Sequence, residues 1–119
     1  MVEGRDFCVW LTGLPASGKT TLALALERHL KAHGLRPVVL DGDDLRQFLW
    51  PELRFSREAR KAQAERATYL AKLIQKAGGI PIVHFPKGLH GLCDLGKDRC
   101  GGVVVKIKSV FHLYPVERQ

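Results

Sequence analysis

The sequence of 119 residues has no apolar run long enough to cross a membrane. A membrane-spanning helix needs about 20 consecutive apolar residues, and charged residues interrupt every apolar stretch before that length is reached. Near the start, Glu3, Arg5 and Asp6 break the basic-then-apolar pattern of a secretory leader. We therefore expect a soluble protein of the cytoplasm that has no membrane partner.

Cysteine is scarce as well. The three cysteines, Cys8, Cys93 and Cys100, are an odd set at irregular spacing, which does not make a disulfide framework. Cys8 lies in an apolar run and is expected to be buried, whereas the other two are expected to be free thiols in loops. Together with His90 and His112 they lack the paired spacing of a zinc finger. We therefore expect no zinc site.

The sequence also lacks a block of like charge, an internal repeat and a low-complexity tract. Its 19 basic and 12 acidic residues give a net charge of +7, but the excess is spread along the chain, so no nucleic-acid-binding tail is predicted. A mild basic excess suits an enzyme that handles small polyanions, although charge alone leaves that question open. Residues 1–119 are expected to form a single domain.

Apolar runs and helical periodicity alternate along the chain. Short apolar runs predict buried strands at 7–12, 36–40 and 80–83. Helical spacing predicts long helices at 19–32 and 57–76, the second with Ser56 as its N-cap and with Ala67, Leu70, Ile74 and Ala77 on one face. A short helical or irregular stretch is expected at 45–49 and a fourth strand at 103–107. The alternation predicts an α/β fold with a parallel sheet and flanking helices.

The strongest motif lies between the first strand and the first helix. Residues 13–20 read G-L-P-A-S-G-K-T and fit G-x-x-x-x-G-K-[ST] at every fixed position. The glycines allow successive backbone N–H groups to point at phosphate oxygens, and the helix start adds its positive dipole end. Lys19 is expected to reach the β- and γ-phosphates of ATP, and Thr20 to ligate Mg²⁺.

A glycine-containing turn with a solvated lysine is the alternative, and the agreement of both flanks disfavours it. The fold is therefore predicted to be P-loop NTPase-like, but this loop is shared by switch GTPases, motor ATPases and small-molecule kinases. The residues expected to bind ATP are Gly13, Leu14, Pro15, Ala16, Ser17, Gly18, Lys19, Thr20 and Thr21.

Two acidic residues, Asp41 and Asp43, follow the second predicted strand. In an open parallel sheet, this end of a strand faces the ligand crevice. A carboxylate there can hold Mg²⁺ or accept a proton from an attacking hydroxyl. The alternative is an Asp-Gly turn with an aspartate that caps the next helix. Beside the phosphate loop, we favour the functional interpretation.

Arginines recur just beyond, at Arg46, Arg60 and Arg66, with Phe55 between them. The guanidinium group binds phosphate or sulfate with two parallel hydrogen bonds, and Phe55 offers a ring on which a purine can stack. Charge pattern alone favours a solvated helix face, with Phe55 packed at the start of the long helix.

Three stretches resemble the adenylylsulfate kinase (APS kinase) family: WLTGLPASGKTTLA, VVLDGDDLR and LRFSREARKAQAERATYLAKLIQKAGG, within residues 9–83. The resemblance implies transfer of the ATP γ-phosphate to the 3′-hydroxyl of adenosine 5′-phosphosulfate, with Mg²⁺, in sulfate assimilation. It implies that Arg46 and Arg60 bind the acceptor, that Phe55 stacks on its adenine, and that Asp43 lies near the acceptor hydroxyl and the metal. Lys19 and Asp43 are thus the expected catalytic residues, Thr20 and Asp43 the metal ligands, and a homodimer the candidate assembly. The expected substrate-binding residues are Asp41, Asp43, Arg46, Phe55, Arg60 and Gln63.

The chain departs from the family pattern in two ways. Asp44, Ala59, Gln63 and Glu65 stand where the family has Asn, Asp, Asn and Arg, which bears on acceptor affinity more than on ATP binding. Residues 84–119 match no part of the family pattern, including its arginine-rich lid, so the completeness of the sheet is left open. A shifted reading frame or early truncation is one hypothesis for this tail. A short variant whose strand at 103–107 completes the sheet is the other.

Two further functions stay open on this sequence. One is a P-loop kinase of another small hydroxyl compound. The other is a nucleotide-binding remnant without activity. A lid that excludes water assists phosphoryl transfer, and no stretch of this sequence matches the lid of the family.

Overall fold

The computed structural model describes residues 7–13, 18–85 and 100–107. Within them the chain forms four strands and three helices. In order along the chain these are β1 (Val9–Gly13), α1 (Lys19–Ala32), β2 (Pro37–Asp41), α2 (Gly42–Leu49), α3 (Arg57–Lys76), β3 (Ile80–His84) and β4 (Val103–Ile107). The two long helices have their predicted bounds, and the predicted strands are confirmed within two residues. The stretch at 45–49, left between helix and irregular structure, belongs to a full helix that begins at Gly42.

The strands form one parallel sheet in the order β2-β3-β1-β4. The α/β architecture with a parallel sheet and flanking helices is thus confirmed. In the register, His84 at the end of β3 is the partner of Asp41 on one side and of Leu11 on the other. Three strands therefore reach the same edge of the sheet with their carboxyl ends.

The fourth strand lies in the segment 84–119, for which the sequence predicts no likeness to the family. All five residues of β4 pair in parallel with β1, from Val103 opposite Val9 to Ile107 opposite Gly13. The prediction of a strand at 103–107 is confirmed. The origin of residues 84–119 stays a prediction.

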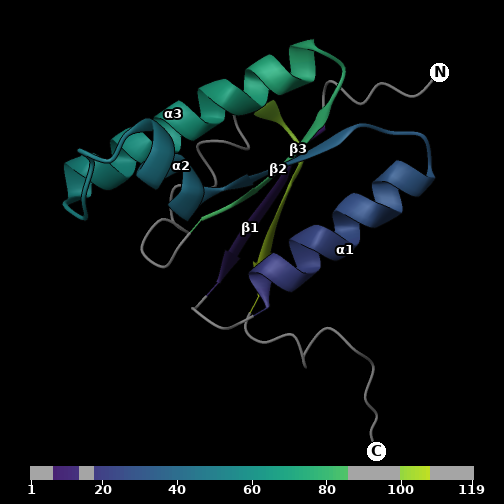
Figure 1. Ribbon diagram of the computed structural model, residues 1–119, viewed down its shortest axis with the longest axis horizontal. Coiled ribbons are helices and arrows are strands. Elements are labelled where there is room, and N and C mark those ends of the chain that lie inside the picture. Colours follow the sequence, from purple (N-terminus) through teal and green to yellow (C-terminus); the bar gives the residue numbers. More distant parts are fainter. Residues whose placement is uncertain (1–6, 14–17, 86–99, 108–119) are drawn as a thin grey trace, which may run out of the picture.

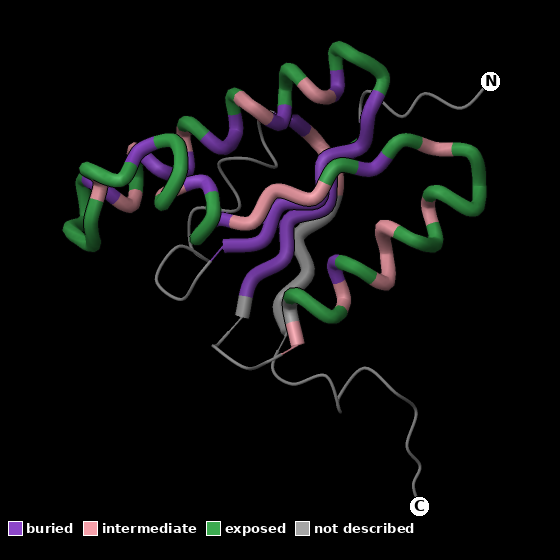
Figure 2. The backbone as a smooth tube through the Cα atoms, in the orientation of Figure 1, coloured by how far each residue is buried: buried purple, intermediate pink, exposed green. Residues whose placement is uncertain are grey.

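Helices cover the two faces of the sheet, with α1 on one side and α3 on the other (Figure 1). The face under α2 and α3 has the larger core, in which Trp10 of β1, Val83 of β3 and Phe85, which follows β3, cluster with Ala64, Ala67 and Ala71 of α3. The face under α1 has a smaller core of Val9, Leu11, Ala23 and Ile82. Figure 2 shows the same contrast, with buried residues running through the strands and along one side of α3 but nearly absent from α1.

The buried side of α3 differs in part from the predicted face. Ala67 is buried as expected, but Leu70 and Ile74 are only half-buried. Ala77 is exposed, and this part of the prediction is wrong because α3 ends at Lys76 and Ala77 is its C-cap.

Polar contacts join α3 to the residues that precede β1 and to those that precede β4. The buried Gln75 side chain donates from Nε2 to the carbonyl oxygen of Phe7 at 3.2 Å and to that of Cys100 at 2.8 Å. Cys8 and Cys100 are both buried. The burial of Cys8 is confirmed, whereas the expectation that Cys100 is a loop thiol is wrong, because it packs in the core beneath α3.

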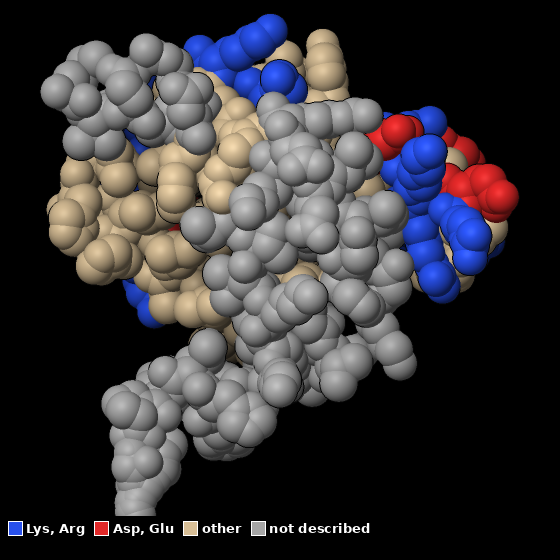
Figure 3. Space-filling model, turned by 180° about the vertical axis from the view of Figure 1, so that it is seen from behind, with Lys and Arg blue, Asp and Glu red and all other residues tan. Residues whose placement is uncertain are grey.

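The described helices do not include one with the combined length and apolar character that a bilayer span requires. Charges of both signs lie side by side at one end of the face drawn in Figure 3. The Lys and Arg residues that are drawn in blue lie at several separate places on this face.

Candidate nucleotide and acceptor site

The candidate site lies at the edge of the sheet where β1, β2 and β3 end. Gly13 is the last residue of β1, Asp41 of β2 and His84 of β3. In open parallel sheets, ligands bind outside the carboxyl ends of the strands. The fold thus brings the start of the phosphate loop and the acidic segment to one edge, as the order of motifs predicts.

The nucleotide half is formed by the end of β1 and the start of α1. Gly18 has φ 101°, a left-handed conformation that favours glycine, and its carbonyl oxygen accepts the N–H of Leu22 at 2.9 Å. The helix has no side-chain cap at Gly18 and no acidic residue in its first turn. Among the described residues, no N-cap side chain accepts its first N–H groups, a setting that favours an anion.

Of the predicted ATP-binding residues, Gly13 ends β1, Gly18 caps α1, and Lys19 is the first residue of α1. Thr20 and Thr21 follow it and are exposed. The remaining four, Leu14, Pro15, Ala16 and Ser17, lie outside the described residues. The metal and phosphate contacts of this loop stay predictions.

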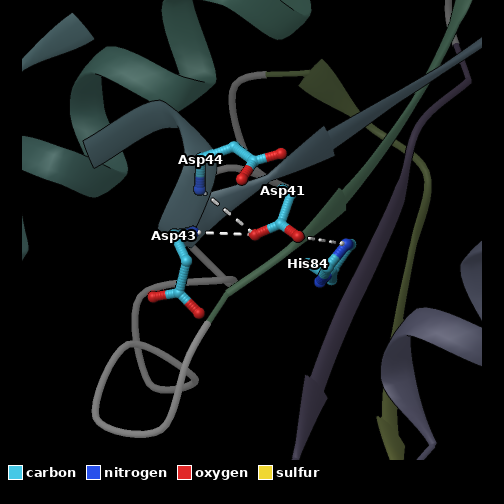
Figure 4. Close-up of polar contacts among 4 residues, drawn as sticks. All are labelled: Asp41, Asp43, Asp44 and His84. Carbon is cyan, nitrogen blue, oxygen red and sulfur yellow. Dashed lines mark hydrogen bonds and ion pairs between the residues drawn. The ribbon is translucent and has the colours of Figure 1, made fainter. Parts of the chain in front are cut away.

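The acidic segment forms the other half of the edge. Asp41 is the N-cap of α2, and its Oδ1 accepts the N–H groups of Asp43 at 2.9 Å and Asp44 at 3.4 Å. Its Oδ2 lies 3.6 Å from Nε2 of His84. Asp43 and Asp44 are exposed, and the Asp43 carboxylate points away from Asp41 (Figure 4). The capping interpretation of this segment therefore holds for Asp41, while Asp43 presents an unburied carboxylate.

Two predicted acceptor residues lie against each other. The Arg46 guanidinium, on α2, is 5.3 Å from the ring centroid of Phe55 in the segment that leads into α3. Phe55 is 62% exposed, so its ring is not packed into the core at the start of α3. A cation over an exposed aromatic ring leaves part of that ring open to a planar ligand.

The other two acceptor residues lie on α3. Arg60, in its first turn, is half-buried, and its backbone N–H donates to the carbonyl oxygen of Ser56. Gln63 is buried, and its Nε2 donates to the carbonyl oxygen of Arg54 at 2.8 Å. Gln63 therefore holds the backbone beside Phe55, and direct contact between its amide and a ligand stays a prediction.

Arg66, the third arginine of the set, is engaged elsewhere. It pairs with Glu52 at 3.1 Å and lies 5.7 Å from the ring centroid of Trp50. Hydrogen bonding from its own backbone, and secondarily from Arg66, lowers the pKa of Glu52. A groove of about 500 Å³ adjoins this ion pair and is lined by Trp50, Ala62, Glu65, Arg66, Tyr69 and Leu70. None of the predicted site residues lines it.

Sequence reasoning missed His84. It ends β3, beside the capping aspartate, and only 7% of its side chain is exposed. The available signal was its position directly after an apolar run, the same position that made Asp41 a candidate. The sequence predicts that the third strand ends at Val83, which places His84 in the following tail.

The described residues contain no group of three or more His, Cys, Asp or Glu side chains that could hold a metal ion by themselves. His90, Cys93 and His112, three members of the rejected zinc set, lie outside the described residues.

The fold and this edge define a P-loop kinase-like α/β protein. The adenylylsulphate kinase family pattern matches residues 5–92. The chain therefore belongs to the adenylylsulphate kinase family, and the match begins before Val9 and continues past Val83, the bounds expected from sequence.

Curated relatives bear the same description. A probable adenylyl-sulfate kinase of Pseudomonas aeruginosa is 49% identical over 76 residues, which are 64% of this chain and 36% of that protein. A probable adenylyl-sulfate kinase of Pyrococcus abyssi is 46% identical over 79 residues, 66% of this chain and 45% of that protein. The chain thus spans about a third to a half of the length of these relatives.

Solved structures agree. A point mutant of the Mycobacterium tuberculosis APS kinase CysC superposes with a TM-score of 0.68 at 31% identity, covering 84% of this chain and 72% of that one. The same kinase in complex with AMPPNP and APS gives a TM-score of 0.66 at 29% identity, covering 84% of this chain and 60% of that one.

Proposed function

We propose that this chain carries the nucleotide and acceptor sites of an adenylyl-sulfate kinase. It would transfer the γ-phosphate of ATP to the 3′-hydroxyl of adenosine 5′-phosphosulfate in sulfate assimilation. One observation carries the proposal. This chain belongs to the family, and the start of α1 lies at the same edge of the sheet as α2. α2 carries the exposed carboxylate of Asp43 and the guanidinium of Arg46, which lies over the exposed ring of Phe55.

In the nucleotide half, the phosphate-loop amides and the first turn of α1 bind the phosphates of ATP, and Lys19 neutralises charge on the β- and γ-phosphates. Thr20 and Asp43 fit a magnesium ion chemically, because both offer exposed oxygen ligands. Mg²⁺ takes few protein ligands and shares phosphate oxygens when bound, and it offsets the charge that develops during transfer.

In the acceptor half, Arg46 and Arg60 bind the phosphosulfate and Phe55 stacks on the adenine. Asp43 orients the 3′-hydroxyl and accepts its proton as the hydroxyl oxygen attacks. Asp41 and Gln63 hold the segments that carry these residues, since one caps α2 and the other holds the carbonyl of Arg54. Catalysis is then positioning and charge stabilisation, without a covalent enzyme intermediate.

Nucleotide binding without turnover is the second candidate, which the phosphate-loop motif and the start of α1 support by themselves. A coupled ADP-release assay with ATP, Mg²⁺ and adenylylsulfate, run beside an ADP titration, separates the two. Release of ADP that depends on adenylylsulfate supports the kinase. ADP binding with no turnover at any acceptor concentration supports the binding function, and turnover with a different hydroxyl acceptor alone would indicate another P-loop kinase.

The substitution Arg60→Ala tests the acceptor half of the site separately from the nucleotide half. We expect the apparent KM for adenylylsulfate to rise about tenfold or more, the loss typical of a charge-assisted contact, with ADP affinity nearly unchanged. Arg57→Ala, one turn earlier on an exposed position of α3, is the matched control. Equal weakening of both ligands by Arg60→Ala would contradict the assignment.

We further propose a homodimer in the cytoplasm. A relative from Thiobacillus denitrificans is described as a hexameric APS kinase, at a TM-score of 0.69 and 32% identity, covering 86% of this chain and 22% of that one. Sedimentation at several protein concentrations would give the assembly of this chain, and a monomer throughout would exclude the dimer.

A further inference from the structure

We propose that His84 is a positioning residue for the acceptor half of the site. Its imidazole holds the Asp41 carboxylate, and Asp41 in turn fixes the start of α2, which carries Asp43 and Arg46. The inference rests on the proposed function for its consequence, the binding of adenylylsulfate.

The position of His84 in the sheet makes this possible. β3 lies between β2 and β1, and His84 is the register partner of Asp41 in one and Leu11 in the other. Side chains of register partners in a parallel sheet point to the same face. His84 therefore stands between the strand that ends in the acidic segment and the strand that leads into the phosphate loop.

The two oxygens of the Asp41 carboxylate contact different partners. Oδ1 accepts the N–H groups of Asp43 and Asp44 and so closes the first turn of α2, whereas Oδ2 faces Nε2 of His84 at 3.6 Å. Figure 4 shows the carboxylate lying between the helix start and the imidazole. At 3.6 Å the contact is longer than a direct hydrogen bond, and it is an ion pair only when the imidazole is protonated. In the proposal, this contact restrains Oδ2, the carboxylate oxygen that does not take part in the helix cap.

Burial of the two side chains strengthens this contact. The side chain of His84 is 7% exposed and that of Asp41 33% exposed, so solvent screens the pair less than it screens a surface pair. A free capping aspartate can rotate about its terminal bond and release the helix start. Restraint on both oxygens fixes the direction of α2, and with it the guanidinium of Arg46 over Phe55.

A purely structural role makes a different prediction. If His84 only fills space, a side chain of similar size without a polar group should replace it without effect on the helix cap. If it positions Asp41, the polar atom matters more than the volume. His84→Leu removes the polar atom and retains bulk, whereas His84→Gln keeps an N–H donor at a similar reach.

The first test measures the cap itself in the ligand-free protein, by amide hydrogen exchange. We expect His84→Leu to speed exchange at the amides of Asp43 and Asp44 about tenfold, with exchange in the middle of α3 unchanged. His84→Gln should restore most of the protection. His33→Leu, which alters an exposed histidine, is the control. Unchanged protection at Asp43 and Asp44 in a folded His84→Leu variant would overturn the inference.

The second test titrates adenylylsulfate into protein saturated with ADP and Mg²⁺, and ADP into the free protein. His84→Leu should weaken adenylylsulfate binding about tenfold and change ADP affinity less than twofold, with rescue by His84→Gln. Equal loss of both ligands, or no loss of either, would overturn the positioning role. Wild-type protein that binds ADP but not adenylylsulfate would overturn the proposed function instead, and the amide exchange would still decide whether His84 holds the cap.

Discussion

The two long helices of this chain differ in how they begin and in how many of their residues are buried. α3 begins with a side-chain cap, because Ser56 Oγ accepts the N–H of Ala59 at 3.1 Å, and it buries seven residues against the sheet. α1 begins at Lys19 with Gly18 as an N-cap that has no side-chain hydrogen bond, and among its described side chains only Ala23 is buried. Both flank the same sheet, yet among the described residues the N-cap side chain accepts an N–H at the start of α3 and not at the start of α1.

The difference separates a helix that holds the fold from a helix that is left available for a ligand. Burial of apolar surface is the main favourable term in folding, so most of the helix-derived stabilisation comes from the α3 face. The first N–H groups of α1 retain their capacity to bind an anion, at the cost of a weaker local structure. Stability and nucleotide affinity are therefore expected to respond to substitutions on opposite faces of the sheet.

The largest expected effect is on the α3 face. Trp10 is fully buried there, its Nε1 donates to the carbonyl oxygen of Gly101 at 3.2 Å, and its ring stacks near Phe85. Trp10→Ala should lower the free energy of unfolding by about 3–5 kcal/mol. Leu26→Ala, at a half-buried position of α1, should cost about 1–2 kcal/mol. Urea unfolding of both variants gives the comparison, and equal losses would show that the two faces contribute alike.

The second effect belongs to α1. ADP with Mg²⁺ at 100 times its dissociation constant should stabilise the protein by about 2.7 kcal/mol, and the gain in amide protection should be larger in the first turn of α1 than in α3. Lys19→Ala should abolish most of this gain, because it removes the cation that meets the β- and γ-phosphates. Arg28→Ala, at an exposed position further along α1, is the control. Protection that rises equally in both helices would contradict the division of roles.

Much of the fold could be predicted from the sequence because each local signal agreed with its neighbours. The phosphate-loop motif lies between an apolar run and a segment with helical spacing, which predicts the β1–α1 unit. Ser56 and the paired glycines at 78–79 indicate the two ends of α3. Errors came where tertiary packing decides burial. Ala77 has helical spacing but lies past the last turn, and Cys100 follows a stretch without periodicity yet packs beneath α3.

The site was predictable to the extent that it is local in sequence. Asp41, Asp43 and Arg46 follow one strand within six residues, so a motif describes them. Phe55 and Arg46 are brought together by the turn between α2 and α3, which only a resemblance anticipated. His84 is 43 positions from Asp41 in the chain and becomes its neighbour only through the pairing of β2 with β3, information that spacing does not contain.

The third prediction concerns the fit of each helix to the sheet. Ala67 has no exposed surface under α3, whereas Ala25 is half-buried on α1. Ala67→Leu adds volume to a closed contact and should cost about 2 kcal/mol in the free energy of unfolding. Ala25→Leu makes the same change where solvent is near, and we expect less than about 0.5 kcal/mol. Thermal unfolding of the pair measures both, and a cost of similar size at Ala25 would mean that α1 packs as tightly as α3.

The smallest effect tests the helix starts directly. Ser56→Ala removes the oxygen that accepts the N–H of Ala59, and loss of such a cap costs about 1 kcal/mol. Ser56→Asp keeps an acceptor and adds a negative charge near the positive end of the helix, so it should retain the stability of the unmodified chain. Because α3 also carries Arg60, fraying of its first turn should weaken adenylylsulfate binding while ADP affinity stays unchanged. A Ser56→Ala variant that loses ADP affinity as well would show that the start of α3 and the start of α1 are coupled through the sheet, and the separation of roles between the two helices would then fail.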